Sequence, residues 1–291
     1  MTAPDVSVII PHFNQPAALA ICLHSLTRQT FARGALEVIV ADNGSDDQAA
    51  LSKALEAFPK ARLVREPMRG AAHARNAAIA GARGRLFAFI DADCVADERW
   101  LAEGVRSLEG ADLSGGDVMV TVADEARPSP VEAFEKVFAF RQRDYVARKK
   151  FSVTANLFVT REALEKTGPF THGLSEDLDF CRRAVALGFR LAFNARSIIG
   201  HPARRDWSEL VRKWDRLVQE RWNGFGGRSP VGRLKWAALA IATAFSAAPH
   251  MFRVLTTRRL KRFVDRAAAA GVLMRIRWWR ARRMFAVLRA G

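Results

Sequence analysis

Cysteine is scarce in this sequence of 291 residues, and the three that occur lie far apart, at Cys22, Cys94 and Cys181. Their odd number and wide spacing predict neither a disulfide framework nor a zinc-binding pattern. We therefore expect a protein of a reducing compartment. No secretory signal is expected either, because the early apolar run Val6–Ile10 has the length of a strand.

Glycine-rich phosphate-binding loops are missing as well. No G-x-G-x-x-G follows a predicted strand and no G-x-x-x-x-G-K-[ST] occurs. This absence removes the main support for the common dinucleotide-binding and ATP-binding proteins. Internal repeats and low-complexity tracts are also lacking. The chain is nevertheless long enough to bury a large core, as one domain or as one domain with an extension.

Acidic residues are rare in the last third of the chain. Residues 1–195 contain 24 Lys and Arg against 25 Asp and Glu, whereas residues 196–291 contain 22 against 5. The net charge of +16 therefore comes from the C-terminal region. Such an asymmetry predicts contact with an anionic surface, either a membrane or a nucleic acid.

Apolar runs alternate with helical patterns along the first hundred residues. This alternation, with short links, is typical of an α/β fold with a mostly parallel sheet and helices on both faces. The predicted strands are 6–11, 36–42, 61–66 and a central run that starts at residue 86, and the predicted helices are 16–29, 48–58 and 70–82.

The later part of the chain is less regular. The patterns there predict helices at 97–108, 131–147, 176–187 and 206–222, strands at 113–120, 153–160 and 191–193, an apolar stretch at 236–252 and a basic stretch at 253–289. We divide the chain into a catalytic domain, 1–205, and a basic helical region, 206–291. Within the first, a nucleotide-binding half is expected to about residue 115 and an acceptor half over 116–205.

Two carboxylates close the central strand. Asp91 and Asp93 are separated by one small residue and follow the apolar run L-F-A-F-I. Because desolvating a carboxylate is costly, the pair is expected at the carboxyl end of the strand, where an open α/β sheet keeps its ligand crevice. Two carboxylates there could hold a divalent cation that also touches phosphate oxygens. Aspartate is equally common in turns and caps, and the short pattern alone favours that alternative.

Five segments, in order, resemble the motifs of family 2 glycosyltransferases. They are V-S-V-I-I-P-H-F-N, V-I-V-A-D-N-G-S-D-D, R-G-A-A-H-A-R-N-A-A-I, F-I-D-A-D and S-E-D-L-D-F-C-R-R. Together they cover roughly residues 5–202, and their order makes the resemblance specific. The resemblance implies a Rossmann-like fold of the GT-A type and an inverting enzyme that uses a nucleotide sugar. The C-terminal third is less securely covered.

The resemblance also implies roles for individual residues. Asp42 matches the aspartate that bonds the nucleobase, and Arg75 matches a position near the base or the phosphates, although alone it would be a solvated helix arginine. Asp91 is expected toward the ribose and in support of the metal. Asp93 is expected as the direct ligand of Mn²⁺ or Mg²⁺. His201 matches a late histidine of the metal site, and a structural role is equally common for a lone histidine.

The segment S-E-D carries the expected catalytic residue. Asp177 matches the general base of the family, and the structural alternative is a first-turn helix acid. Its neighbour Glu176 is expected to contact the donor. Asn156 matches a position that lines the donor sugar, although a buried asparagine also needs bonding partners of its own. The other residues expected to line the donor site are Pro11, Phe13 and Asn43.

The resemblance implies a single displacement as the reaction. Asp177 takes the proton of an acceptor hydroxyl, which then attacks the anomeric carbon from the face opposite the nucleotide. A UDP-sugar is the expected donor. A glycan or a lipid-linked acceptor in polysaccharide biosynthesis is the expected partner, and a hexosyltransferase is the expected enzyme. A nucleotidyltransferase on a similar fold is an alternative, but no glycine-rich loop with Arg and Lys follows the first strand.

The basic C-terminal region has two possible uses. Met274, Trp278, Ala281, Phe285 and Leu288 recur on one helical face, opposite the basic residues, which favours an interfacial membrane helix. We expect Trp278, Phe285 and Leu288 to enter the headgroup layer at the cytoplasmic face of the cell membrane. The stretch 236–252 is expected to be buried or interfacial rather than spanning. Nucleic-acid binding is the alternative, since aromatic residues interleave with arginines.

Overall fold

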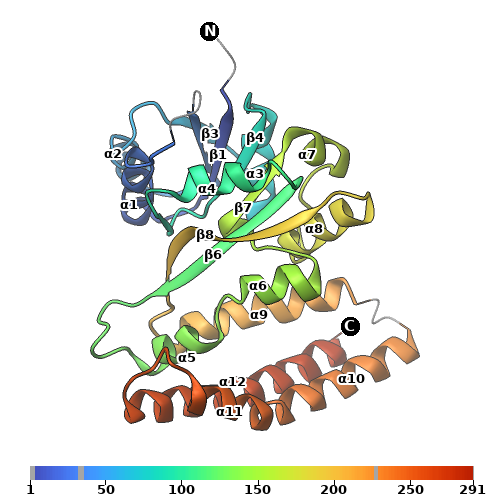
Figure 1. Cartoon of the computed structure of the whole chain (residues 1–291). Helices are drawn as coiled ribbons and strands as arrows, with labels where there is room; N and C mark the ends of the chain where they lie inside the picture. The colour runs from blue at the N-terminus through green and yellow to red at the C-terminus, as the bar shows by residue number, and fades with distance from the viewer. Residues whose placement is uncertain (1–3, 32–35, 226–228, 291) are drawn as a thin grey trace. The chain divides into compact units, whose positions relative to one another are not determined.

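The computed structural model describes residues 4–31, 36–225 and 229–290, and the chain divides into two compact units (Figure 1). The first unit comprises Met1–Met119, Arg141–His172 and Glu176–His201, and the second comprises Val120–Phe140, Gly173–Ser175 and Pro202–Gly291. The chain passes from the first unit to the second for the last time at residue 202, close to the boundary that we predicted at 205. The second unit also takes residues 120–140, which the sequence patterns placed in the catalytic domain.

Parallel strands form one half of the sheet in the first unit. β1 (Val6–His12) lies between β2 (Leu36–Asp42) and β4 (Leu86–Phe89), and β3 (Arg62–Arg65) borders β2. The strands β1, β2 and β4 start in register. Their carboxyl ends therefore lie along one edge of the sheet, which is where ligands bind in α/β folds.

The second half of the sheet contains one strand that is reversed between two strands of the common direction, so the sheet is mostly parallel, as predicted. Among the described residues the strand order is β3-β2-β1-β4-β7-β6-β8-β5. Its second half consists of β7 (Leu157–Thr160), β6 (Leu113–Thr121), β8 (Leu191–Pro202) and β5 (Val95–Ala96). The strand predicted at 191–193 is the start of β8, which continues for twelve residues and pairs with β5. This long return brings residue 201 to the end of the central strand.

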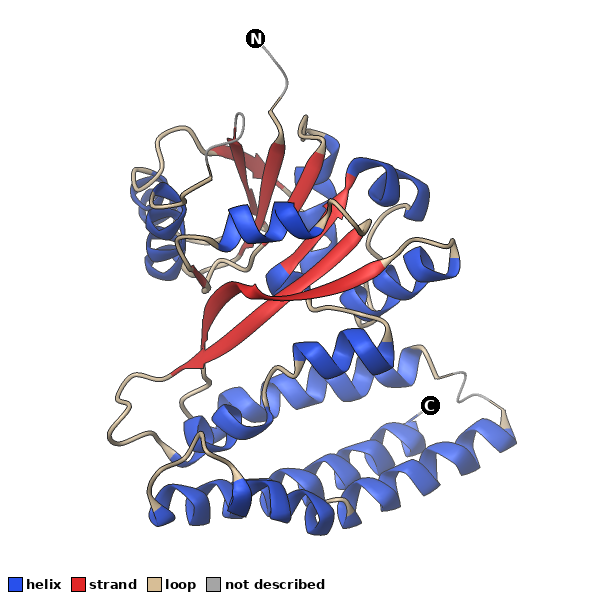
Figure 2. Ribbon diagram, in the orientation of Figure 1, coloured by secondary structure: helices blue, strands red, loops and turns tan. Residues whose placement is uncertain are grey.

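Helices flank the sheet of the first unit (Figure 2). They are α1 (Pro16–Thr27), α2 (Gln48–Leu55), α3 (Ala71–Ala80), α4 (Trp100–Ser107), α7 (Arg161–Thr167) and α8 (Glu176–Ala186). The alanine-rich α3 packs on β1 and β2, and Ala72, Ala74 and Ala78 are fully buried in a core shared with Ile9 and Phe89. Small side chains let this helix lie close to the strands and hold its polar residues at a fixed place.

The single helix predicted over 131–147 is wrong. α5 (Pro130–Phe138) begins with a capping box between Ser129 and Glu132, and it ends before Phe140, whose φ of 33° does not fit a continuing helix. The chain resumes as α6 (Gln142–Asp144) and the π-helical turn η1 (Tyr145–Lys149). The strand predicted at 153–160 also starts late, after a 3₁₀ turn, η2 (Thr154–Asn156).

Four further helices form most of the second unit. α9 (Trp207–Asn223) starts as predicted, because Asp206 accepts a hydrogen bond of 2.9 Å from the backbone N–H of Glu209. The apolar stretch predicted at 236–252 is divided between α10 (Pro230–Phe245) and α11 (Ala247–Thr256). The basic stretch predicted at 253–289 begins in α11, and most of it forms α12 (Phe263–Ala290), which packs against α5, α9, α10 and α11.

The helix α12 is the core helix of the second unit. Its residues Leu273 and Ile276 lie in one buried cluster with Phe134 of α5, and Met284 lies in another with Trp236 of α10. Phe285 and Leu288 pack against that second cluster. The expectation that these two residues enter a headgroup layer is therefore corrected, whereas Trp278 is 56% exposed.

Candidate active site

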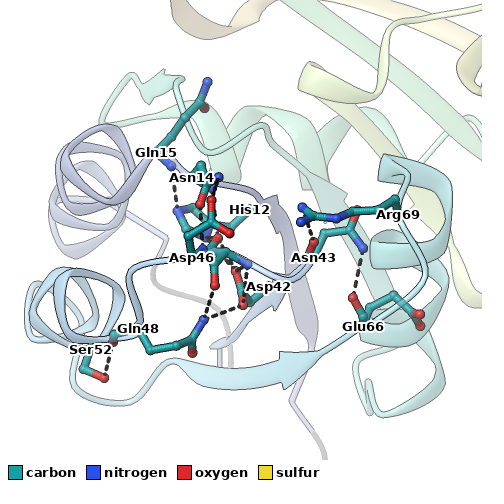
Figure 3. A network of polar contacts seen from close by, with 11 residues as sticks. His12, Asn14, Gln15, Asp42, Asn43, Asp46, Gln48, Ser52, Glu66 and Arg69 are labelled. Atoms are coloured by element: carbon teal, nitrogen blue, oxygen red, sulfur yellow. Dashed lines mark hydrogen bonds and ion pairs between the residues drawn. The ribbon is translucent and has the colours of Figure 1, made fainter.

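Asp42, at the end of β2, is the centre of a buried polar network (Figure 3). Ser45 Oγ donates to Asp42 Oδ1 at 2.5 Å, Gln48 Nε2 donates to Oδ2 at 3.2 Å, and His12 Nδ1 lies 3.2 Å from Oδ1. Burial works against the charge, but hydrogen bonds from Ser45, Gln48 and His12 lower the pKa of Asp42 below its ordinary value. The carboxylate is thus held charged, and it fixes the ends of β1 and β2 together.

Asn43 fixes the loop that leads to α3. Its side-chain amide donates to the carbonyls of Glu66 and Met68 at 3.0 and 2.7 Å, and its Oδ1 accepts from the N–H of Gly70 at 2.6 Å. Gly70 has a φ of 133°, which favours glycine. Asn43 thereby sets the position of α3, and with it that of Arg75.

An aromatic platform lies beside this loop. The Phe13 ring is 45% exposed, and the guanidinium of Arg69 lies 4.1 Å from its centroid. Arg69 Nη1 also donates to the carbonyl of Asn43 at 3.1 Å (Figure 3). Phe13 was predicted to line the donor site, as was its near neighbour Pro11 in β1. Arg69 was missed, although it opens the quoted segment R-G-A-A-H-A-R-N.

Arg75 joins two elements that are 101 residues apart in the sequence. It is 97% buried, so it is not the solvated helix arginine of the alternative interpretation; its Nη2 donates to Asp91 Oδ1 at 2.7 Å and its Nη1 donates to Glu176. Burial alone would lower the pKa of Arg75, but the charges of Glu176 and Asp91 raise it above its ordinary value. Asp177 adds to the same effect. The arginine therefore brings the D-x-D segment and the start of α8 to one place.

Asp93 and His201, which the family resemblance assigns to one metal site, lie near each other. His201 Nε2 is 3.8 Å from Asp93 Oδ1, because β8 pairs with β5 so that Gly200 faces Val95. Asp93, Cys94 and His201 each offer one ligand atom, and these atoms lie within 4.8 Å of one another. Burial raises the pKa of Asp93, and the Asp91 carboxylate adds to the rise while His201 opposes it. This donor set fits a divalent cation.

The two acids that open α8 have different surroundings. Glu176 is paired with Arg75, whereas Asp177 Oδ1 accepts the backbone N–H of Leu178 at 2.7 Å. Both lie in the first turn of the helix, where the macrodipole favours a negative charge. Glu176 is therefore tied to the D-x-D segment through Arg75, and the charge of Asp177 acts on the same guanidinium.

Asn156 has structural partners. It is fully buried; its Oδ1 accepts from Trp100 Nε1 at 2.9 Å, and its Nδ2 donates to the carbonyls of Asp117 and Ser197 at 2.8 and 3.0 Å. These bonds satisfy the amide and tie β6 and β8 to the end of η2. The role of Asn156 at the donor sugar stays a prediction, and the structure gives it a second role.

Comparison with known proteins adds to this geometry. The model of the family described as glycosyl transferase family 2 matches residues 7–168. Glycosyltransferase AglE of Haloferax volcanii is 33% identical over 226 residues, which cover 74% of this chain and 72% of AglE. The chain belongs to glycosyltransferase family 2. The resemblance seen in the five sequence motifs is thereby confirmed, and the protein is a glycosyltransferase.

Other family members match shorter shares of their own length. The pre-mycofactocin glycosyltransferase of Mycobacterium tuberculosis is 28% identical over 225 residues, or 72% of this chain and 45% of that protein. The Escherichia coli UDP-Glc:alpha-D-GlcNAc-diphosphoundecaprenol beta-1,3-glucosyltransferase WfgD is 37% identical over 100 residues, or 33% of this chain and 36% of WfgD.

A solved structure confirms the predicted fold. The mannosyltransferase PcManGT of Pyrobaculum calidifontis, in complex with GDP-Man and Mn²⁺, has a TM-score of 0.63 and 20% identity, and the match covers 98% of this chain and 86% of that one. The family 2 enzyme described here therefore has a GT-A fold with a helical C-terminal extension.

Proposed function

We propose that this glycosyltransferase moves a sugar, with inversion, from a nucleotide-diphosphate sugar to a hydroxyl of a glycan or lipid-linked acceptor. The observation that carries the proposal is the gathering of three groups along one edge of the sheet. These are the Asp42 network, the Arg75 cluster and the Asp93–His201 pair. A UDP-sugar remains the preferred donor.

The chain's own residues would bind the donor in a fixed order along this edge. The exposed Phe13 ring is suited to stack on the base, beside the Asp42 network at the ends of β1 and β2. Asp91 would face the ribose. Arg75 would lie near the phosphates, held in place by two carboxylates so that it loses little freedom on binding.

The metal site would be built from Asp93 and His201, with Asp91 in support. When Mn²⁺ or Mg²⁺ is bound, it supplies positive charge that neutralises the departing diphosphate. Asp177 would accept the proton of the acceptor hydroxyl, and the hydroxyl oxygen would attack the anomeric carbon from the face opposite the nucleotide. Glu176 is unsuited to that role because Arg75 holds it as an ion pair.

The test is a comparison of donor binding with sugar transfer. A thermal-shift screen of nucleotide sugars with Mn²⁺ identifies the donor, since a ligand that binds only the folded state raises the melting temperature. Asp177→Asn should bind that donor normally and transfer about 10²–10⁴-fold more slowly. Asp93→Ala should lose metal-dependent binding. Full transfer by Asp177→Asn, or donor affinity that chelation leaves unchanged, would contradict the assignments.

The exposed apolar surface of the second unit supports the proposal of a lipid-linked acceptor. One face of α10 and α11, the α10–α11 apolar face, consists of Val231, Leu234, Ile241, Phe245, Phe252 and Leu255, each more than half exposed. Their spacing is helical, and exposed basic residues follow at Arg258, Arg259, Lys261 and Arg262. An apolar helix face bordered by cations suits the interface of an anionic membrane.

The α10–α11 apolar face favours docking on a membrane rather than crossing it. The segment Pro230–Thr256 is long and apolar enough to span, with a mean hydropathy of 1.3, and 22% of its apolar window is buried. The opposite face of these helices, however, carries Trp236, Ala240 and Val254 into the core of the second unit. A spanning helix would have to leave that core. We therefore propose peripheral docking on the cytoplasmic face, where a lipid-linked acceptor such as that named for WfgD would be met.

Vesicle co-sedimentation tests the docking. Phe245→Ser with Phe252→Ser should lower retention on anionic vesicles at least tenfold and leave transfer to a soluble acceptor unchanged. The matched control is Leu187→Ser with Ile21→Ser, two exposed apolar residues of the first unit. Equal retention of both double variants, or equal retention on neutral and anionic vesicles, would contradict the proposal. Salt-sensitive retention on DNA instead would favour nucleic-acid binding.

A further inference from the structure

Cys94 lies beside the proposed metal ligands and has no part in the function proposed so far. Its Sγ is 3.7 Å from Asp93 Oδ1, and His201 Nε2 is 3.8 Å from the same oxygen. All three ligand atoms lie within 4.8 Å of one another. A thiol, a carboxylate and an imidazole therefore gather at one point of the first unit.

The spacing of these atoms suits one shared ion. Zinc lies about 2.3 Å from sulfur and about 2.0–2.2 Å from nitrogen and oxygen, so two ligands at a tetrahedral angle are about 3.4–3.6 Å apart. The distances of 3.7 and 3.8 Å from the Asp93 oxygen are close to that value. Small side-chain rotations would complete the arrangement.

The backbone also holds the three residues at this place. Cys94 follows Asp93 directly, and its N–H donates to the carbonyl of Asp91 at 3.0 Å, which closes a turn. The pairing of Val95 with Gly200 then puts His201 across from Cys94 on the neighbouring strand. Cys94 is fully buried and His201 is 8% exposed, whereas the Asp93 side chain is 26% exposed. A cation can therefore arrive from the Asp93 side.

We propose that Cys94 is a third protein ligand of the metal, and that its sulfur gives the site a preference for borderline cations such as Zn²⁺, Co²⁺ and Fe²⁺ over Mg²⁺. On binding, the thiol releases its proton to solvent and the sulfur forms a bond to the cation. The inference rests on the proposed metal role of Asp93 and His201. It changes the expected ion and leaves the roles of Asp177 and the nucleotide edge as they are.

Co²⁺ added to the metal-free protein reads out the sulfur directly, because a cobalt–thiolate bond gives strong near-ultraviolet charge-transfer absorption. The chain has three cysteines, so Cys22→Ser with Cys181→Ser leaves Cys94 as the sole thiol. This double variant should keep the band at wild-type strength, and Cys94→Ser should lose it. Calorimetry should show at least a tenfold loss of Zn²⁺ affinity in Cys94→Ser and less than about a twofold change for Mg²⁺.

The outcomes separate this inference from the proposed function. Co²⁺ binding without the band, in wild type and in the double variant, would overturn the Cys94 assignment and leave the Asp93–His201 site standing. Absence of binding by Co²⁺, Mn²⁺ and Mg²⁺ in the presence of UDP would overturn both. If Cys94→Ser does not fold, the double variant alone decides, since any charge-transfer band there arises from Cys94.

Discussion

The two units of this chain bury arginine in opposite ways. In the first unit, Arg75 lies between Asp91 and Glu176, and these charges raise its pKa although burial opposes it. In the second unit, burial and the nearby charges of Arg277 and Arg221 together lower the pKa of Arg280 to about 9. Arg280 lies over the Trp214 ring at 3.7 Å, so an aromatic face contacts its guanidinium where two carboxylates contact that of Arg75.

This contrast indicates what each unit does with charge. The first unit pairs its cations with carboxylates of its own, so its charges position other groups of the site. The second unit brings Arg280, Arg277 and Arg221 close to one another, and an anion from outside would relieve their repulsion. Other cations of the second unit are paired: Glu135, which is 2% exposed, accepts hydrogen bonds from Arg204 and Lys213, and Asp215 forms an ion pair with Arg283.

The largest effect is expected from removal of the Arg75 charge. Arg75→Met should lower the free energy of unfolding of the first unit by about 3–5 kcal/mol, because two carboxylates then face each other without a cation. Arg75→Lys should lose less, since it keeps the charge but cannot bridge both acids. Urea unfolding measures both variants. A loss below about 1 kcal/mol for Arg75→Met would mean that solvent already screens the pair.

Glu135→Gln should remove the carboxylate that forms ion pairs with Arg204 and Lys213 in the second unit. We expect a loss of about 2–4 kcal/mol, because the buried Lys213 and its neighbour Arg204 then lack an anion. Burial already lowers the pKa of Lys213, which Glu135 partly restores. The same unfolding measurement applies, with the exposed Glu125→Gln as control. Similar losses for both variants would show that Glu135 contributes little.

Asp42→Asn should cost about 1–2 kcal/mol near neutral pH, because hydrogen bonds to a charged acceptor become bonds to a neutral one. The pKa of Asp42 is lowered from 3.8, so its stabilisation is complete above that value and is lost as the pH falls through the lower folded-state pKa. Unfolding measured from about pH 6 to about pH 2 should show the variant and wild type converging. A difference in the free energy of unfolding that does not change with pH would show that the substitution acts through packing.

Arg280→Met should have the smallest effect, within about 1 kcal/mol and of either sign, because the apolar contact with Trp214 is kept while a crowded charge is removed. Arg282→Met, at an exposed position of the same helix, is the control. Retention on anionic vesicles should fall similarly for both. A large destabilisation by Arg280→Met would show that Arg280 has a structural partner and would weaken the contrast between the units.

Much of the fold and several parts of the site follow from local patterns in the sequence. The ends of β2 and β4 are marked by Asp42 and the D-x-D pair, because a carboxylate at the end of an apolar run needs water, a ligand or hydrogen-bond partners that the interior of a sheet lacks. The α/β class follows from the alternation of elements. The partners of Arg75 do not follow, since Glu176 is 101 residues away and no spacing rule links them.

The rest depends on tertiary register. His201 was predicted by family resemblance. That Cys94 lies near His201 depends instead on the pairing of β5 with β8, and β5 has only two residues. The break in the helix at Phe140 was missed because the apolar spacing in the sequence continues across this residue. The positive φ of Phe140 is a property of the folded backbone that the spacing does not reveal. Phe285 and Leu288 share a helical face with Trp278, but packing against α10 takes only part of that face.

The place of α5 in the chain has a consequence for biosynthesis. This helix is made before residues 141–201 of the first unit, yet its buried partners Leu273 and Ile276 belong to α12. A growing chain must therefore expose Val131 and Phe134 until well over a hundred further residues have been added, which takes roughly ten seconds or more at usual elongation rates. During that interval the apolar face of α5 is prone to aggregation. A chaperone that binds nascent chains should protect this face until α12 has been synthesised.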